Sequence, residues 1–151
     1  MPRVPFPLDD VACQVAVVGC GKKKQETRRA VPAEELYTGA YFREVLAACK
    51  ARYDFVCIVS ALHGLVLIDT HIAPYDLMLP WGTRGANEKI VRQFRDRCYA
   101  PPGFLTLGYN IDLHAGRNYA RWFTTHNDKA TVRWADWGPI GRRRQKYREL
   151  R

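Results

Sequence analysis

The stretch FVCIVSALHGLVLIDTHIAPYDL, residues 55–77, decides the fold class of this 151-residue chain. Its first five residues, Phe55 to Val59, are apolar and rich in β-branched side chains, a run too short for a helix and typical of a buried parallel strand. In open α/β sheets, ligands bind beyond the carboxyl ends of the strands. The residues that follow the strand are therefore candidates for a site, and the first of them are Ser60, His63 and Gly64.

The rest of the chain alternates short apolar runs with amphipathic segments, the pattern of an α/β domain. Strands are predicted at residues 14–18, 55–59, 104–109 and 131–134, with a second short apolar run at 65–68. A first helix is predicted to begin at Pro32 and to be interrupted at residues 37–39. Further helices are predicted at 40–53, 87–99, 114–123 and 142–150. We expect one compact three-layer α/β domain over residues 1–151 with a mostly parallel central sheet. Residues 1–13 would be an N-terminal extension and residues 141–151 a basic C-terminal helix.

The net charge of +9 is concentrated in two segments. Residues 22–29 hold five basic residues and one acid, a charge of +4, and residues 141–151 hold six basic residues and one acid, a charge of +5. The rest of the chain is balanced, since +4 and +5 make up the whole excess. Two basic clusters favour a polyanion such as DNA, single- or double-stranded, as partner, although they also serve solubility.

The chain lacks the signatures of a membrane or secreted protein. No apolar stretch approaches about 18 residues, and the first residues do not form the apolar segment of a signal peptide. The five cysteines, at 13, 20, 49, 57 and 98, show no paired metal-binding spacing. We expect a cytoplasmic monomer with no membrane association, no metal and no cofactor.

A glycine- and lysine-rich loop, Gly19 to Lys24, follows the first strand. Glycines let backbone amides approach an anion, and lysines add charge, so the loop is suited to DNA phosphates. The alternative is a strand-ending turn with solvated lysines. The Cys20 thiol is either activated by the lysines or merely structural. The predicted phosphate-binding residues are Cys20, Gly21, Lys22, Lys23, Arg142, Arg143 and Arg144.

Three segments resemble the YaaA peroxide-stress proteins: residues 36–39 (LYTG), 59–66 (VSALHGLV) and 72–77 (IAPYDL). The chain is more similar still to a family of short YaaA-like bacterial and phage domains. Three motifs of that family match this chain. They are Cys20 with Lys22, His114-Ala115-Gly116 with Tyr119, and residues 138–141. The resemblance covers residues 14–147 and implies association with DNA, with proposed DNA-glycosylase activity on modified bases. His63 and Asp76 depart from the YaaA pattern, which usually has tyrosine and arginine there.

Cleavage of an N-glycosidic bond needs a carboxylate near the sugar cation and a donor to the departing base. Asp76 and His63 are the residues that we expect in these two catalytic roles. Each has a structural alternative, a turn for Asp76 and backbone hydrogen bonds for His63, and His114 would cap a helix. The predicted substrate-binding residues are Tyr37, Thr38, Gly39, Ser60, Tyr75, His114 and Gly116.

Three functions remain open at this stage. The first is a DNA glycosylase that removes modified or damaged bases, with phage defence as one setting for that activity. The second is a DNA-binding and DNA-protecting stress protein without catalysis. The third is a nucleoside or base transferase that uses the same residues but does not need the basic C-terminal segment.

Overall fold

A computed structural model of the chain describes residues 2–6, 8, 15–76, 110–126 and 131–151. Within these ranges the strands are β1 (Val15–Gly19), β2 (Val31–Pro32), β3 (Phe55–Ser60), β4 (Gly64–Leu67), β5 (His71–Ile72), β6 (Asn110–His114) and β7 (Thr131–Trp134). The helices are α1 (Ala33–Leu36), α2 (Ala40–Arg52), α4 (Arg117–His126) and α5 (Ile140–Glu149). The predicted helix at 87–99 and the predicted strand at 104–109 lie outside the described residues.

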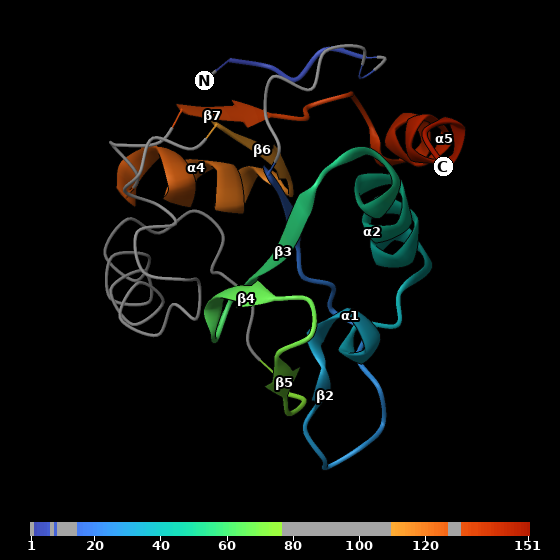
Figure 1. Cartoon of the computed structure of the whole chain (residues 1–151), viewed down its shortest axis with the longest axis vertical. Helices are drawn as coiled ribbons and strands as arrows, with labels where there is room; N and C mark the ends of the chain where they lie inside the picture. The colour runs from blue at the N-terminus through green and yellow to red at the C-terminus, as the bar shows by residue number, and fades with distance from the viewer. Residues whose placement is uncertain (1, 7, 9–14, 77–109, 127–130) are drawn as a thin grey trace.

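Five strands form one sheet in the order β4-β3-β1-β6-β7. The neighbours β3, β1, β6 and β7 run parallel, and β4 alone runs antiparallel, against β3. A separate two-stranded sheet pairs β2 with β5. The prediction of a mixed α/β domain with a mostly parallel sheet is therefore confirmed (Figure 1).

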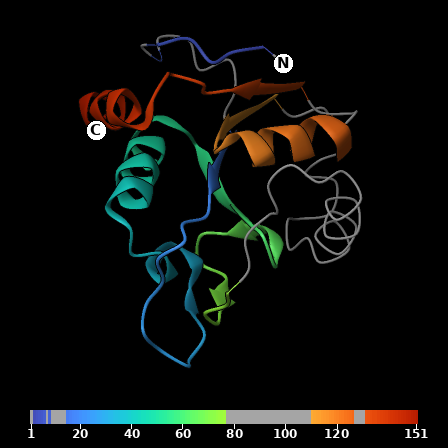
Figure 2. The same cartoon turned by 180° about the vertical axis from the view of Figure 1, so that it is seen from behind.

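Alternate residues of the strands enter two different apolar clusters, as the two-residue period of a strand requires. Ala16 and Val18 of β1 pack with α2 and α5, which lie side by side (Figure 2). Val15 and Val17 pack in the second cluster with Ala120 of α4. The central strands are therefore buried on both faces, which explains their nearly continuous apolar sequences.

Helix α2 presents the predicted apolar stripe to the first cluster. Its four members recur at helical spacing, and all are buried: Phe42, Val45, Leu46 and Cys49. Basic residues Lys50 and Arg52 occupy its last turn, where they complement the partial negative charge of a helix C-terminus. Complete burial of such an apolar side chain stabilises the fold by roughly 1.5–3 kcal/mol.

Two glycines make the strand ends possible. Gly64 has φ = 76° where the chain turns from β3 into β4, a conformation that disfavours any residue with a Cβ. A Cβ on Gly19, at the end of β1, would lie 2.9 Å from the Cβ of Ala115. The ends of β1 and β6 thus approach closely only because residue 19 lacks a side chain.

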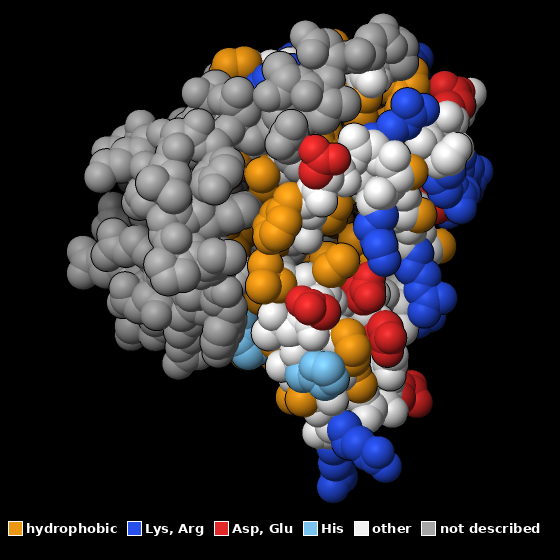
Figure 3. Space-filling view, viewed as in Figure 1, with side chains coloured by type: hydrophobic (Ala, Val, Ile, Leu, Met, Phe, Trp, Pro, Cys, Tyr) orange, Lys and Arg blue, Asp and Glu red, His pale blue; other side chains and the backbone are white. Residues whose placement is uncertain are grey.

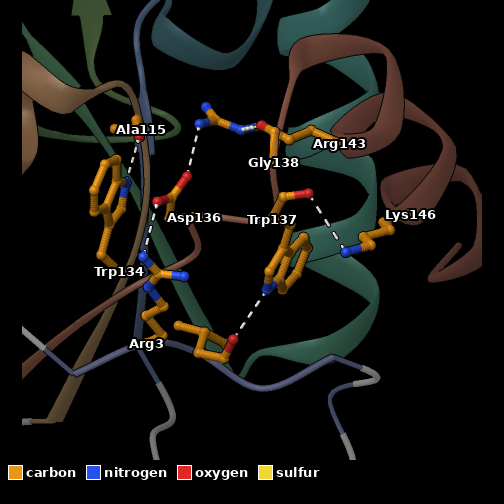
Figure 4. Close-up of polar contacts among 9 residues, drawn as sticks. Arg3, Ala115, Trp134, Asp136, Trp137, Gly138, Arg143 and Lys146 are labelled. Atoms are coloured by element: carbon orange, nitrogen blue, oxygen red, sulfur yellow. Dashed lines mark hydrogen bonds and ion pairs between the residues drawn. The ribbon is translucent and has the colours of Figure 1, made fainter.

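The N-terminal residues are part of the domain. The amide of Val4 donates to the carbonyl of Trp134 at 3.0 Å, and the amide of Trp134 donates to the carbonyl of Pro2 at 2.8 Å. Trp137 Nε1 donates to the Val4 carbonyl (Figure 4). Residues 2–4 therefore run beside the end of β7. This pairing is not predicted from the sequence, in which residues 1–13 are expected to form an N-terminal extension.

Most described elements begin or end within one residue of the predicted bounds, and two helix starts differ by more. The helix expected to begin at His114 begins at Arg117, because His114 is the last residue of β6 and pairs with Val18. The basic helix begins at Ile140, two residues before Arg142. Among the described residues, none of the helices has the length and apolar character needed to cross a membrane.

Candidate functional site

The carboxyl ends of the parallel strands lie at one edge of the sheet, and polar side chains gather there. Ser60 ends β3, and its Oγ lies 2.7 Å from the hydroxyl of Tyr75, which in turn lies 2.6 Å from the hydroxyl of Tyr37. We call these three residues the hydroxyl cluster. The backbone amides of Leu62 and His63 donate to Ser60 Oγ at 3.2 and 3.1 Å. The β3–β4 turn therefore orients the cluster.

A thiol and a lysine lie next to the hydroxyl cluster. Cys20 Sγ lies 2.9 Å from the hydroxyl of Tyr119, and Lys24 Nζ lies 4.4 Å from the ring centroid of Tyr75 and 5.7 Å from that of Tyr37. An ammonium over an aromatic face is an attractive arrangement. The loop after β1 thus contributes a half-buried cation as well as exposed ones.

The tyrosines of this site hold their protons firmly. Burial raises the pKa of Tyr75 well above its ordinary value, and the neighbouring Cys20 and Tyr37 raise it further. Burial likewise raises the pKa of Tyr37 and of Tyr119. At neutral pH all three phenols are therefore protonated and act as hydrogen-bond donors rather than as bases.

Of the two predicted catalytic residues, His63 contacts this cluster, and Asp76 is next to one of its members in the sequence. The His63 ring packs edge-on against Tyr75, with ring centroids 5.5 Å apart, and is partly exposed. Asp76 follows Tyr75 directly and is exposed. The structure thus brings His63 to Tyr75 and leaves the Asp76 carboxylate in contact with solvent, while the catalytic roles of both stay predictions.

His114 does not lie at this site but in a buried network beneath the sheet. Asp112, which is fully buried, accepts two hydrogen bonds from Arg133, at 2.7 and 2.8 Å, and one from the Tyr53 hydroxyl at 2.7 Å. His114 Nε2 lies 2.9 Å from that same hydroxyl, and Nδ1 lies 2.9 Å from the hydroxyl of Tyr147. We call these five residues the buried network.

The bonds of the buried network assign the tautomer of His114. The single proton of the Tyr53 hydroxyl goes to Asp112, so His114 Nε2 must carry a hydrogen and donate to Tyr53, while Nδ1 accepts from Tyr147. Burial lowers the pKa of His114 from 6.5 to about 4, and the opposing effect of Asp112 is smaller. His114 is 3% exposed and both of its ring nitrogens are hydrogen-bonded within the buried network, so the structure does not bring it to the hydroxyl cluster, and substrate binding by His114 stays a prediction.

The lysines and arginines among the predicted phosphate-binding residues divide into exposed cations and cations that are ion-paired with described residues. Lys22, Lys23 and Arg142 are exposed. Arg144 forms a bidentate ion pair with Glu44, both bonds at 2.9 Å, and Arg143 donates to Asp136 at 3.1 Å (Figure 4). Arg143 and Arg144 would have to give up these carboxylates to hold a phosphate, so phosphate binding by the basic helix remains a prediction best suited to Arg142.

Exposed basic side chains are visible at the lower tip of the molecule, over the loop between β1 and β2, and along the edge formed by α2 and α5 (Figure 3). Glu44 offsets part of the second group, because Arg148 also donates to it, at 2.9 Å. The Arg144 hydrogen bonds are the main cause that lowers the pKa of Glu44 to about 2.

The remaining predicted residues are Thr38, Gly39, Gly116 and Gly21, and of these Gly21 lies against Tyr37 of the hydroxyl cluster. Thr38 Oγ1 is buried and has no hydrogen-bond partner within the described part of the chain. Gly39 precedes α2, and Gly116 precedes α4 and is exposed. A Cβ on Gly21 would contact Phe42 at 3.6 Å. Across the described ranges, His, Cys, Asp and Glu form no group of three or more that could hold a metal ion.

Sequence reasoning missed Lys24 and the buried network. Lys24 is the third lysine of a run whose first two are exposed, and only its bridge to Tyr37 turns it toward the site. The signal for the network is Asn110–His114 (NIDLH), in which Asp112 and His114 alternate with Ile111 and Leu113. Polar residues at alternate positions of a strand buried on both faces indicate an internal network, whereas a surface strand would expose them.

The comparison with protein families matches residues 15–149 to a family of unknown function, DUF6884. A comparison with curated proteins finds no match to the chain. The family match covers both the hydroxyl cluster and the buried network.

Proposed function

We propose a function for this chain, which belongs to the family of unknown function DUF6884, from its own site. The proposed function is that of a DNA glycosylase, which hydrolyses the N-glycosidic bond of a modified or damaged base. Phage defence is the biological role that we propose for this activity. The observation that carries the proposal is the grouping of His63, Tyr75 and Lys24 around one hydroxyl cluster, with the exposed carboxylate of Asp76 beside it.

The architecture supports this location of the site. We infer three layers, because α2 and α5 share one apolar cluster with the sheet and α4 shares the other. In such a sandwich the carboxyl ends of the parallel strands are the edge where ligands bind. Cys20 and Cys49 form no disulfide with another described residue, which supports a reducing cytoplasmic compartment.

The proposed reaction uses two residues in complementary roles. As the bond between C1′ and the base nitrogen breaks, its electron pair leaves with the base and positive charge grows on the sugar. The Asp76 carboxylate stabilises that charge and accepts a proton from the water whose oxygen bonds to C1′. His63 gives a proton to the departing base. The proton balance closes when Asp76 releases its proton to solvent and His63 takes one up.

DNA would reach the site through backbone contacts and extrusion of one nucleotide. Lys22 and Lys23 are exposed on the loop that also carries Lys24, so they are placed to hold phosphates next to the site. A base inside a duplex is inaccessible to a side chain such as His63, and glycosylases therefore flip their target nucleotide out of the stack. The exposed Arg142 is a further phosphate contact in this proposal.

The test is to incubate the protein with duplexes and single strands that carry a panel of modified bases, including glucosylated hydroxymethylcytosine, and to measure abasic sites. We expect abasic sites with at least one modification, and loss of turnover in His63→Ala and Asp76→Asn with DNA affinity retained. Matched controls are His71→Ala and Asp69→Asn, which change an exposed histidine and an exposed aspartate on the same stretch. No abasic sites across the whole panel would refute the proposal.

A second candidate, a DNA-binding and DNA-protecting protein without catalysis, is favoured by the net charge of +9. This function predicts a salt-dependent affinity for DNA that is unchanged in His63→Ala and Asp76→Asn. It also predicts that the protein leaves the DNA chemically unaltered. A transferase acting on nucleosides would instead keep its rate in Arg142→Ala, which removes an exposed cation, whereas removal of residues 142–151 would take Tyr147 and Leu150 out of the core. These outcomes separate the three functions.

A further inference from the structure

The hydroxyl cluster contains one more proton than its internal hydrogen bonds use. Ser60 Oγ accepts from the amides of Leu62 and His63, which occupies both of its lone pairs. Its own hydrogen must therefore point to Tyr75, 2.7 Å away. Between Tyr75 and Tyr37, at 2.6 Å, one hydroxyl donates and the other accepts. Three hydroxyl protons thus serve two bonds, and one proton is left over.

Burial indicates which phenol carries the spare proton. Tyr37 is 0% exposed, and its hydroxyl meets Tyr75 and Ser60 inside the cluster. A buried hydroxyl hydrogen without an acceptor loses its hydration without compensation. Tyr75 is partly exposed, so its hydrogen can meet a ligand or water. The favoured arrangement has Tyr37 and Ser60 both donating to Tyr75, and Tyr75 donating away from the cluster.

Resting on the glycosylase function proposed above, we propose that Tyr75 is a further catalytic residue, whose hydroxyl donates a hydrogen bond to the acceptor atom of the substrate base on which negative charge develops. Ser60 and Tyr37 are positioning residues, because they act on the base only through Tyr75. The substrate class follows from the donor: a base that exposes a ring nitrogen or carbonyl oxygen as an acceptor. This role differs from base stacking by the Tyr75 ring.

The surroundings of Tyr75 suit this role. Two accepted hydrogen bonds polarise its O–H bond and strengthen the one it donates. The Lys24 ammonium, 4.4 Å from the ring centroid, adds positive charge beside the place where the base becomes negative. Because burial raises its pKa, the phenol keeps its proton throughout. The electron pair of the broken C1′–N bond stays on the base, and the proton that neutralises the base comes from His63.

The experiment compares single-turnover cleavage by variants that each remove one oxygen atom. Tyr75→Phe is expected to lower the rate about 100-fold, the effect of losing one oriented donor to developing charge. Tyr37→Phe removes a supporting bond and is expected to lower the rate about fivefold. Tyr41→Phe, a half-buried tyrosine of α2 outside the cluster, is the matched control with an unchanged rate. Thermal melting of each variant establishes that the fold is retained.

Two further readouts separate a donor from a packing role. The loss in Tyr75→Phe should shrink for bases that leave more readily as anions, since they need less stabilisation. Duplexes with an uncleavable 2′-fluorinated nucleotide should bind the wild type more tightly when the modified base is present, and Tyr75→Phe should abolish that preference while Tyr37→Phe keeps it.

The outcomes bear separately on the two proposals. A wild type that prefers the modified base through Tyr75 but makes no abasic sites would refute the glycosylase and support Tyr75 as the donor to the base. A Tyr75→Phe variant with the wild-type rate and base preference would overturn the inference, as would a loss in Tyr37→Phe as large as that in Tyr75→Phe. A wild type without any base preference would overturn it too.

Discussion

The hydroxyl cluster and the buried network are both chains of polar side chains linked at 2.6–2.9 Å, yet their hydrogen-bond balances differ. In the buried network both nitrogens of His114 and the hydroxyl of Tyr53 have defined partners, and the Asp112 carboxylate is paired with Arg133. In the hydroxyl cluster one proton is left over at a partly exposed phenol. A network whose donors and acceptors are all paired stabilises the fold, whereas a group with an unused donor has a hydrogen bond to offer to a ligand.

The same contrast separates the two basic segments. Arg144 and Arg148 share the carboxylate of Glu44, while Lys22 and Lys23 are exposed. Membership of a basic cluster in the sequence therefore says less about the role of a charged residue than the ion pairs that the residue already forms in the fold.

The largest effect is expected from Asp112→Asn. This change removes the charge that faces Arg133 inside the fold, and breaking a buried ion pair costs about 3–5 kcal/mol. Denaturant unfolding followed by circular dichroism measures the loss. Tyr75→Phe, in the hydroxyl cluster, should lose only about 1 kcal/mol, the value of one neutral hydrogen bond. Equal losses in the two variants would erase the distinction between the regions.

Acidification should weaken the buried network through His114. The pKa of His114 is about 4 in the folded protein, below its ordinary 6.5, so the unfolded chain binds the proton first as the pH falls. Stability is therefore complete above pH 6.5 and declines between pH 6.5 and pH 4, by about 3 kcal/mol in total. Unfolding curves across this range measure the decline, and His114→Gln should be less stable at pH 7 but flatter over the same window.

Removal of the exposed lysines Lys22 and Lys23 should weaken DNA binding without affecting stability. For the double variant Lys22→Ala/Lys23→Ala, the slope of log affinity against log salt should fall by about 1.8 if each lysine neutralises one phosphate of a duplex. Arg144→Ala should leave the slope nearly unchanged and lower the melting temperature, since its partner is Glu44. Fluorescence anisotropy at several salt concentrations gives both slopes. A larger change of slope in Arg144→Ala would assign the phosphate contact to the basic helix.

The smallest effect, with the opposite sign, is expected from Thr38→Val. The substitution keeps the shape of the side chain and removes a buried hydroxyl that has no partner in the described residues. Because an unsatisfied hydroxyl costs about 1 kcal/mol or more, the variant should be as stable as the wild type or slightly more stable. A clear loss of stability, measured by thermal melting, would indicate that Thr38 Oγ1 is hydrogen-bonded in solution.

Much of the fold was predictable from local pattern. The strands at Val15–Gly19, Phe55–Ser60 and Thr131–Trp134 and the stripe of α2 follow from hydrophobic period alone. The expected start of a helix at His114 was wrong because a polar residue after an apolar run resembles a cap. Only the pairing of β6 with β1 shows that residue 114 continues a strand.

The site was predictable in its location but not in its connections. The order of the chain places Ser60, His63 and Tyr75 near the end of one strand. The meeting of Tyr37 with Tyr75 spans 38 positions and that of Cys20 with Tyr119 spans 99, and such contacts depend on the assembled fold. The same holds for Arg144, whose partner Glu44 lies 100 positions away on another helix.

The pairing of residues 2–4 with β7 has a consequence for handling the protein. The outer side of a terminal strand carries unpaired amides and carbonyls, which in other proteins join the sheets of neighbouring molecules. Here Pro2 and Val4 form backbone hydrogen bonds with Trp134, so the N-terminal residues cover the edge of the sheet at the end of β7. Deletion of residues 2–4, or a bulky fusion that pulls them away, should promote aggregation of otherwise folded molecules, whereas a fusion after Arg151 should not.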